Sequence, residues 1–202
     1  MLSAAKHLSE IIDAVMLAVF LECYSRSFIP NKRIIMSILY RLTQLFTALI
    51  AHLTPEERAL VASVLSPAEL RLFERMPRHD QRHCLDVYRL LLRGGYADPL
   101  LLRAALLHDC GKVDDAGRPI PLPYYGLFVV LKRVAPALYA WAARNGRGPL
   151  HPFAIHAAHD QRSARMTEAA GSPPELVATL RDYAERRMTE RTRALSWADN
   201  QV

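Results

Sequence analysis

Apolar residues recur at helical spacing through most of the chain, and this pattern predicts its elements. Between residues 80 and 92, three apolar residues share the helix face of His83, namely Val87, Leu90 and Leu91. No segment alternates apolar and polar residues between hairpin turns, as a half-buried strand would. The pattern therefore predicts an all-α fold, a multi-helix bundle of about eight to ten helices.

Several helix starts are marked by a capping residue followed by proline. Thr54-Pro55 and Ser66-Pro67 each have a glutamate three residues after the cap, which is the pattern of a capping box. We expect Ser172-Pro173 to repeat this pattern. Asp98-Pro99 is expected to begin the helix that ends in AALLHDCGK, where Gly111 stands at the position of a left-handed residue that would end it.

The N-terminal part of the chain differs from the rest. Pro30, in SRSFIPNKR, interrupts the helical pattern before a second candidate start at Met36. We therefore expect an N-terminal appendage over residues 1–35 and a helical domain over 36–202. No signal-peptide pattern is present at the N-terminus. Loops are expected at 113–123 and 146–149, and His151 should be extended or in a turn because proline follows it.

Two segments combine apolar and cationic residues. Residues 34–53 form an apolar stretch with Arg41 near its centre, a position at which a bilayer-spanning helix rarely carries a charge. Residues 127–144 form a second amphipathic stretch, with Pro136 inside it. Such segments usually pack on a core, and the alternative is a peripheral contact with a membrane or with another protein.

Composition and charge narrow the possible partners. The 202 residues are 51% hydrophobic and carry a net charge of +6, which suits a globular protein with an anionic ligand. The arginines are scattered, so there is no specific nucleic-acid signal. Cys23, Cys84 and Cys110 show no zinc or redox spacing, so we expect a reducing, cytoplasmic setting. The oligomeric state stays open.

Histidines are concentrated in the middle of the chain, and two of them suggest a metal site. Six of the eight histidines lie between residues 79 and 159. His108 and Asp109 end an apolar helix, where an unpaired polar group costs about 1–3 kcal/mol. His83 faces inward from the preceding helix and is a natural partner. Histidine combined with carboxylate suits a divalent transition metal.

These residues resemble the HD superfamily of metal-dependent phosphohydrolases. The matching positions are His83 in QRHCLDVYRLLL, His108 and Asp109 in LLRAALLHDCGK, and Asp199 in LSWADNQV. The resemblance implies an HD-type helical bundle in which these four side chains hold a divalent ion: manganese, iron, cobalt, nickel or zinc. It also implies hydrolysis of a small phosphate ester, such as a nucleotide or cyclic nucleotide.

A second part of the chain resembles HD proteins similar to the cyclic-dinucleotide phosphodiesterases. HDQRSARMTEAAGSPPELVATLRDY matches the segment that supplies further metal-binding histidines there, with His159 in the place of the first. Tyr183 stands where that pattern continues to a histidine. We therefore expect one metal ion per chain, with His159 as a pocket residue that contacts a phosphate or a metal-bound water.

The expected catalytic residues are Asp109, Lys112 and His159. Lys112 follows His108 by one turn, where it would pair with phosphate or else remain a solvated cation at a helix end. Arg82, beside His83, is a second candidate for phosphate contact. The remaining histidines are not expected to bind the metal: His79 should lie in the first helical turn or before it, and His151 and His156 outside the set of ligands. Cys84 and Cys110 are expected to pack between helices.

The sequence leaves a second function open. The departure at Tyr183 would also fit a non-catalytic HD-like protein that binds a ligand or acts as a scaffold. A bound divalent metal with open coordination positions would favour the enzyme over that alternative.

Overall fold

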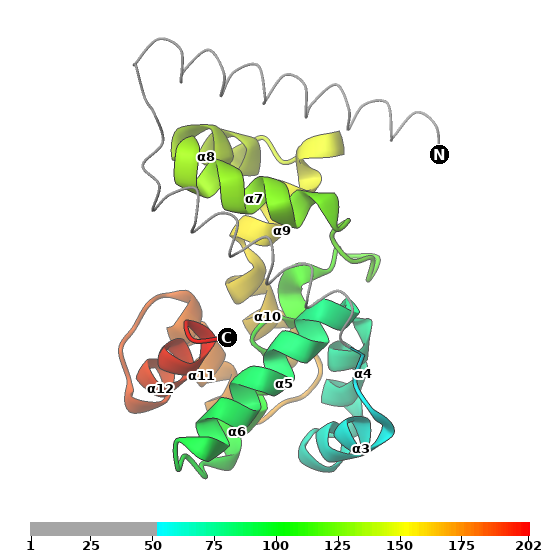
Figure 1. Ribbon diagram of the computed structural model, residues 1–202, viewed down its shortest axis with the longest axis vertical. Helices are drawn as coiled ribbons and strands as arrows, with labels where there is room; N and C mark the ends of the chain where they lie inside the picture. The colour runs from blue at the N-terminus through cyan, green and yellow to red at the C-terminus, as the bar shows by residue number, and fades with distance from the viewer. Residues whose placement is uncertain (1–51) are drawn as a thin grey trace. The chain divides into compact units, whose positions relative to one another are not determined.

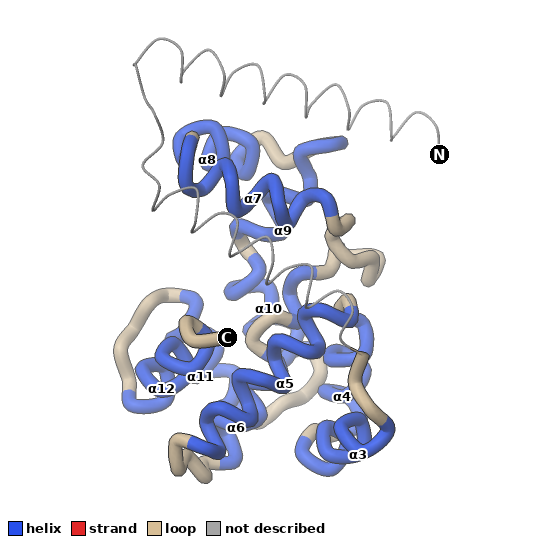
Figure 2. Tube along the Cα trace, in the orientation of Figure 1, coloured by secondary structure: helices blue, strands red, loops and turns tan. Residues whose placement is uncertain are grey.

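The computed structural model describes residues 52–202, which contain ten α-helices, two short 3₁₀ helices and no strand (Figure 1, Figure 2). The predicted all-α fold of eight to ten helices is confirmed. The α-helices are α3 Pro55–Val64, α4 Pro67–Arg75, α5 Arg78–Arg93, α6 Pro99–Leu107, α7 Pro123–Val134, α8 Pro136–Arg144, α9 His151–Ala157, α10 His159–Ala169, α11 Pro174–Ala184 and α12 Glu190–Asp199; the 3₁₀ helices are η1 Cys110–Lys112 and η2 Gly148–Leu150.

Some predictions fall outside the described residues. They are the appendage at 1–35 with its boundary, the second start at Met36, and the stretch 34–53 except for its last two residues. Within residues 52–202, none of the helices combines the length and the apolar character needed to cross a bilayer.

The described residues belong to two compact units, and the boundary between them falls inside α9. Residues 121–154 belong to the smaller unit, and residues 52–120 and 155–202 to the larger. In the smaller unit, Phe128 and Phe153 pack edge to face with ring centroids 5.0 Å apart. The predicted stretch 127–144 divides between α7 and α8, because Pro136 lacks the N–H that a continuous helix would require.

Two predictions about helix starts are wrong. His151 is not extended but begins α9, where Pro152 in the first turn lacks an N–H that would have no helical partner anyway. Ser172 does not cap a helix, because α11 starts only at Pro174 and Pro173 takes the cap position. The Ser172 hydroxyl instead donates to Glu69 Oε1, at 2.6 Å. The capping boxes of Thr54 and Ser66 are confirmed.

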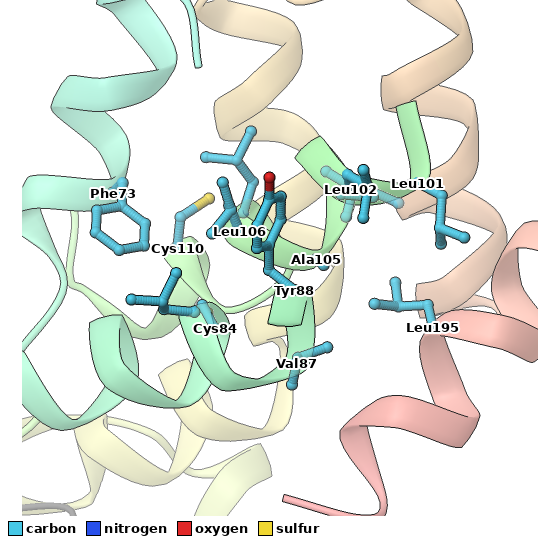
Figure 3. Packing of buried hydrophobic residues seen from close by; sticks show 14 of the residues in the cluster. Phe73, Cys84, Val87, Tyr88, Leu101, Leu102, Ala105, Leu106, Cys110 and Leu195 are labelled. Atoms are coloured by element: carbon cyan, nitrogen blue, oxygen red, sulfur yellow. The ribbon is translucent and has the colours of Figure 1, made fainter. Parts of the chain in front are cut away.

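The core of the larger unit is built mainly from α5, α6, α11 and α12. α5 packs on α6 and α12, while α10 packs on α11 and η1. Figure 3 shows part of this core, including Val87 on α5, Leu106 on α6 and Leu195 on α12. Cys84 and Cys110 are buried free thiols within it, as predicted. These helices place the residues of the candidate site.

Candidate metal centre

The predicted His-Asp pair lies at the end of α6. The last turn of this helix is fully buried, from Ala104 to Leu107, and His108 is the residue that ends it. Asp109 follows immediately, before η1. Both side chains are enclosed with their helix, at 2% and 3% exposure. Two groups that are costly to desolvate are therefore placed together in the core, as predicted from their position at the end of an apolar helix.

The four predicted metal ligands come together from three helices. His83 on α5, His108 and Asp109 each have a ligand atom within 4.8 Å of the others. Asp199, at the end of α12, places Oδ1 2.9 Å from His83 Nε2 and 3.5 Å from His108 Nε2. Asp109 Oδ2 lies 3.8 Å and 3.7 Å from the same two nitrogens. Residues separated by more than 100 positions thus form one cluster.

One atom of this cluster lacks a hydrogen-bond partner. His108 Nδ1 lies 2.9 Å from the carbonyl oxygen of Ala105, which only accepts, so Nδ1 carries a proton. His108 Nε2 is buried and makes no hydrogen bond. In the neutral ring this nitrogen directs a lone pair towards Asp109 and Asp199. A histidine held through its Nδ1–H, with Nε2 near carboxylates, has an arrangement that could bind a metal.

The electrostatics show how the cluster is balanced without a metal. Burial alone would lower the pKa of His108, but Asp109 and Asp199 outweigh it and raise that pKa well above its usual value. Burial would raise the pKa of Asp109, but Lys112, His108 and His159 hold it well below its usual range. The pKa of Asp199 is also lowered, because the two neighbouring histidines, His108 and His83, outweigh its burial. A divalent cation would replace the proton on His108, so the residues fit such an ion.

Gly111 determines how closely the site approaches α10. It is not left-handed as predicted; it lies within η1. The missing side chain of Gly111 lets η1 pack closely on α10. A Cβ at this position would lie 2.2 Å from the carbonyl oxygen of His159 and 2.6 Å from the nitrogen of Ser163. The Ser163 hydroxyl locks this contact by accepting from the Gly111 N–H and donating to the carbonyl of His108.

This contact places His159 beside the cluster. Its Nδ1 donates to the carbonyl of His156 at 2.6 Å, and its Nε2 lies 3.4 Å from Asp109 Oδ1. The same Nε2 is 3.1 Å from Asp160 Oδ1. Asp160 was not singled out from the sequence, although His159-Asp160 repeats the His-Asp pair of positions 108 and 109. His156 stacks on His159, with ring centroids 5.5 Å apart.

Lys112 bridges two buried carboxylates. Its Nζ lies 2.5 Å from Asp109 Oδ2 and 3.2 Å from Asp80 Oδ1. The alternative of a solvated cation at a helix end is wrong, since this side chain is 14% exposed. Asp80 is a further residue that sequence reasoning missed; its signal was its place on α5, three residues before His83.

Tyr183 also belongs to the cluster. Its hydroxyl donates to Asp199 Oδ2 at 2.6 Å, and its ring meets that of His108 edge to face, with centroids 6.2 Å apart. Burial, followed by the charge of Asp199, raises the pKa of this phenol, so it stays a donor. The tyrosine therefore holds one oxygen of Asp199 and leaves Oδ1 to the histidines.

Other candidates lie outside the cluster. Arg82, predicted as a phosphate contact, is instead bound to Glu57 and Asp86. His79 lies in the first turn of α5, as predicted, and its Nε2 is 3.6 Å from Asp80 Oδ2. Burial raises the pKa of the Cys110 thiol to about 12, which makes it a poor nucleophile.

The cluster is closed on one side and open on the other. His108 and Asp109 are almost fully enclosed, whereas the side chains of His83 and Asp199 are 25% and 28% exposed. An ion held by all four would thus be anchored on buried ligands and reached from the side of the other two.

Comparisons with known proteins do not identify the centre. The chain matches no protein-family model, no curated protein and no solved structure. The assignment of a candidate metal centre therefore rests on the donor atoms, their distances and the unpaired nitrogen of His108.

Proposed function

We propose that the protein is a metal-dependent phosphohydrolase of HD type that acts on a small phosphate ester. The observation that carries this proposal is His108 Nε2, a buried nitrogen without a hydrogen-bond partner beside two carboxylates and a second histidine. A binding module without a metal would be expected to satisfy such an atom with a donor or acceptor of its own.

The residues that would hold the ion are His83, His108, Asp109 and Asp199. Two neutral imidazoles and two carboxylates suit manganese, iron, cobalt, nickel or zinc. Such an ion, when bound with open positions, lowers the pKa of water and neutralises charge on phosphoryl oxygens. One ion per chain fits the use of Asp199 Oδ2 by Tyr183.

The surrounding side chains have roles of their own in this proposal. Lys112 compensates the charge of Asp109 and Asp80, and so keeps the Asp109 carboxylate ionised as a ligand. His159 Nε2 lies 3.4 Å from Asp109 Oδ1 and 3.1 Å from Asp160 Oδ1, beside the open face of the cluster. From this place His159 can donate a proton to a leaving oxygen as a general acid.

The test is hydrolysis of p-nitrophenyl phosphate and bis(p-nitrophenyl) phosphate by protein loaded with manganese. We expect turnover that EDTA abolishes and that the metal restores. Asp109→Asn should remove metal and activity together. His159→Gln should keep the metal and lower the rate about 10²-fold or more, as expected for the loss of a general acid.

A matched control is Glu168→Gln. Glu168 is an exposed carboxylate on the same helix as His159, paired with Arg181 on the surface. This variant should retain both metal and rate. Metal binding without turnover of either ester or of a nucleotide panel would favour the ligand-binding or scaffold alternative. A rate that is indifferent to EDTA would contradict the proposal.

The free thiols of Cys84 and Cys110 suit a reducing compartment. We therefore extend the proposal to a cytoplasmic enzyme whose partner is a small phosphorylated substrate.

A further inference from the structure

Three helices of the larger unit end in the same way, but one of them lacks the usual residue. After α5, α10 and α11 the chain turns with one residue in the left-handed region, and the next N–H bonds back to a carbonyl five residues earlier. In the first two helices that residue is glycine, Gly95 with φ 82° and Gly171 with φ 74°. After α11 it is Arg186, with φ 58°.

Arginine at this position is unfavourable for the backbone. A left-handed residue with a side chain brings its Cβ close to the following carbonyl, a penalty that glycine avoids. Arg186 is the one non-glycine residue with positive φ among residues 52–202. Gly95 and Gly171 occupy the same position in the other two turns, so the arginine is the exception among the three.

That side chain extends to the edge of the metal cluster. Its guanidinium lies 5.9 Å from the centre of the Tyr183 ring, and Tyr183 holds Asp199. One of its nitrogens is 3.7 Å from Asp160 Oδ2, and Asp160 contacts His159. Arg186 thus adjoins the residues that support both the open ligand and the proposed proton donor, while its side chain remains 73% exposed.

The other cations near the cluster already have close partners. Lys112 is held between Asp109 and Asp80. Arg82 is held by Glu57 and Asp86. Arg162 donates to the carbonyl oxygens of Gly111 and Val113 and is 16% exposed. Arg186 differs from them, because its contact at 3.7 Å is loose and most of its surface is open to solvent.

We infer that Arg186 recognises the phosphate group of the substrate at the open edge of the cluster. This inference rests on the proposed function and adds a specific anion contact to it. A guanidinium presents paired donors that match two phosphate oxygens, and an exposed side chain can turn from Asp160 to such a ligand. The left-handed backbone is the structural cost of placing the guanidinium there.

The test combines stability with anion binding in the variant Arg186→Gly. A merely structural arginine would stabilise the fold, so its loss would lower the melting temperature. We expect the opposite: relief of the left-handed backbone raises it by about 2–4 °C. The dissociation constant for inorganic phosphate, titrated by calorimetry into manganese-loaded protein, should rise about tenfold or more.

Two further variants make the result specific. Arg187→Ala removes the same charge from the next residue, whose partners are Asp182 and Glu185, and should leave phosphate affinity within about twofold. Arg186→Lys keeps the charge without the paired donors and should fall between wild type and Arg186→Gly. Equal losses in Arg186→Gly and Arg187→Ala, or no loss in either, would overturn the inference.

The same titration on metal-free protein separates the two proposals. If the wild type takes up no manganese, the metal-dependent function fails, and the metal-free comparison of Arg186→Gly with Arg187→Ala still tests the anion contact. If manganese binds and phosphate affinity is unaffected by Arg186→Gly, the anion contact alone is wrong.

Discussion

Two buried carboxylates in the larger unit have opposite surroundings. Glu69 on α4 is fully enclosed, and both of its oxygens accept bonds from Arg103 while Ser66 and Ser172 supply further donors. Asp109 is equally enclosed, yet the histidines around it lie 3.4–3.8 Å away, and one of them has a nitrogen without a hydrogen bond.

The difference separates a structural charge from a candidate ligand. Glu69 is stabilised within the protein: burial would raise its pKa, and the bonds from Ser172, Ser66 and Arg103 outweigh burial and lower it. Asp109 contacts Lys112 closely. The nitrogens of His83 and His108 lie near enough to Asp109 for all three side chains to bind one metal ion. A buried carboxylate whose hydrogen bonds are all made indicates a structural role. A buried carboxylate beside histidines that it does not hydrogen-bond indicates a candidate metal ligand.

The largest effect should come from breaking the satisfied carboxylate. Glu69→Ala removes a fully enclosed carboxylate and leaves the partly buried Arg103 without its partner, so it should lower the free energy of unfolding by about 3–5 kcal/mol. The stabilisation that manganese gives, about 2.7 kcal/mol at 100 times its dissociation constant, should persist in this variant. Urea unfolding with and without manganese measures both. Loss of the metal-dependent increment would show that the two regions are not separate.

Gly111→Ala should disturb the cluster through the backbone. The added Cβ meets the His159 carbonyl and the Ser163 nitrogen, so η1 must move away from α10. We expect a loss of about 1–3 kcal/mol in unfolding free energy together with weaker manganese binding. Thermal unfolding and a metal titration provide the two values. The control is Gly95→Ala, which strains a left-handed turn (φ 82°) in open space and should lower stability while leaving manganese binding unchanged.

Tyr183→Phe should lower metal affinity more than it lowers the stability of the fold. Without the hydroxyl, Asp199 loses the bond that orients its carboxylate. Loss of such a supporting contact typically lowers metal affinity about 10–100-fold, whereas one hydrogen bond contributes about 1 kcal/mol to stability. Competition with a chromophoric chelator measures the affinity. Unchanged affinity would mean that Asp199 is not a ligand.

The smallest effect is a dependence on pH. His108 has a raised pKa in the metal-free fold, so it is protonated near neutral pH and must lose that proton to bind a metal. Calorimetry at pH 7 in buffers of different ionisation enthalpy should show about one proton released per metal. In the metal-free protein the raised pKa stabilises the fold fully below about pH 6.5, and this contribution is lost as pH rises through the folded-state pKa. Metal binding without proton release would contradict the protonated state assigned to His108 in the metal-free protein.

Much of the fold was predictable because its signals are local. Capping residues and proline placed α3, α4 and α6 correctly, and apolar spacing identified the inner face of α5. The errors arose where tertiary contacts override local preference. Ser172 bonds Glu69 across the core and does not cap a helix, and Gly111 is required by close packing and not by its φ angle.

The candidate site was predictable in part. Spacing and resemblance named the four candidate ligands and His159, which the structure brings together. Asp80, Asp160 and the role of Tyr183 depend on which side chains meet across helices, which a single sequence does not reveal. The charge pairs of Arg82 and Lys112 were missed for the same reason.

The measurement that tests the central claim most directly is the metal content of the protein, by mass spectrometry, after purification without a histidine tag and reconstitution with manganese. We predict one equivalent of a divalent transition metal in the wild type, none in Asp109→Ala, and one in the control Glu168→Gln. A wild type without metal, or an Asp109→Ala variant that keeps it, would contradict the assignment of His83, His108, Asp109 and Asp199 as a metal centre.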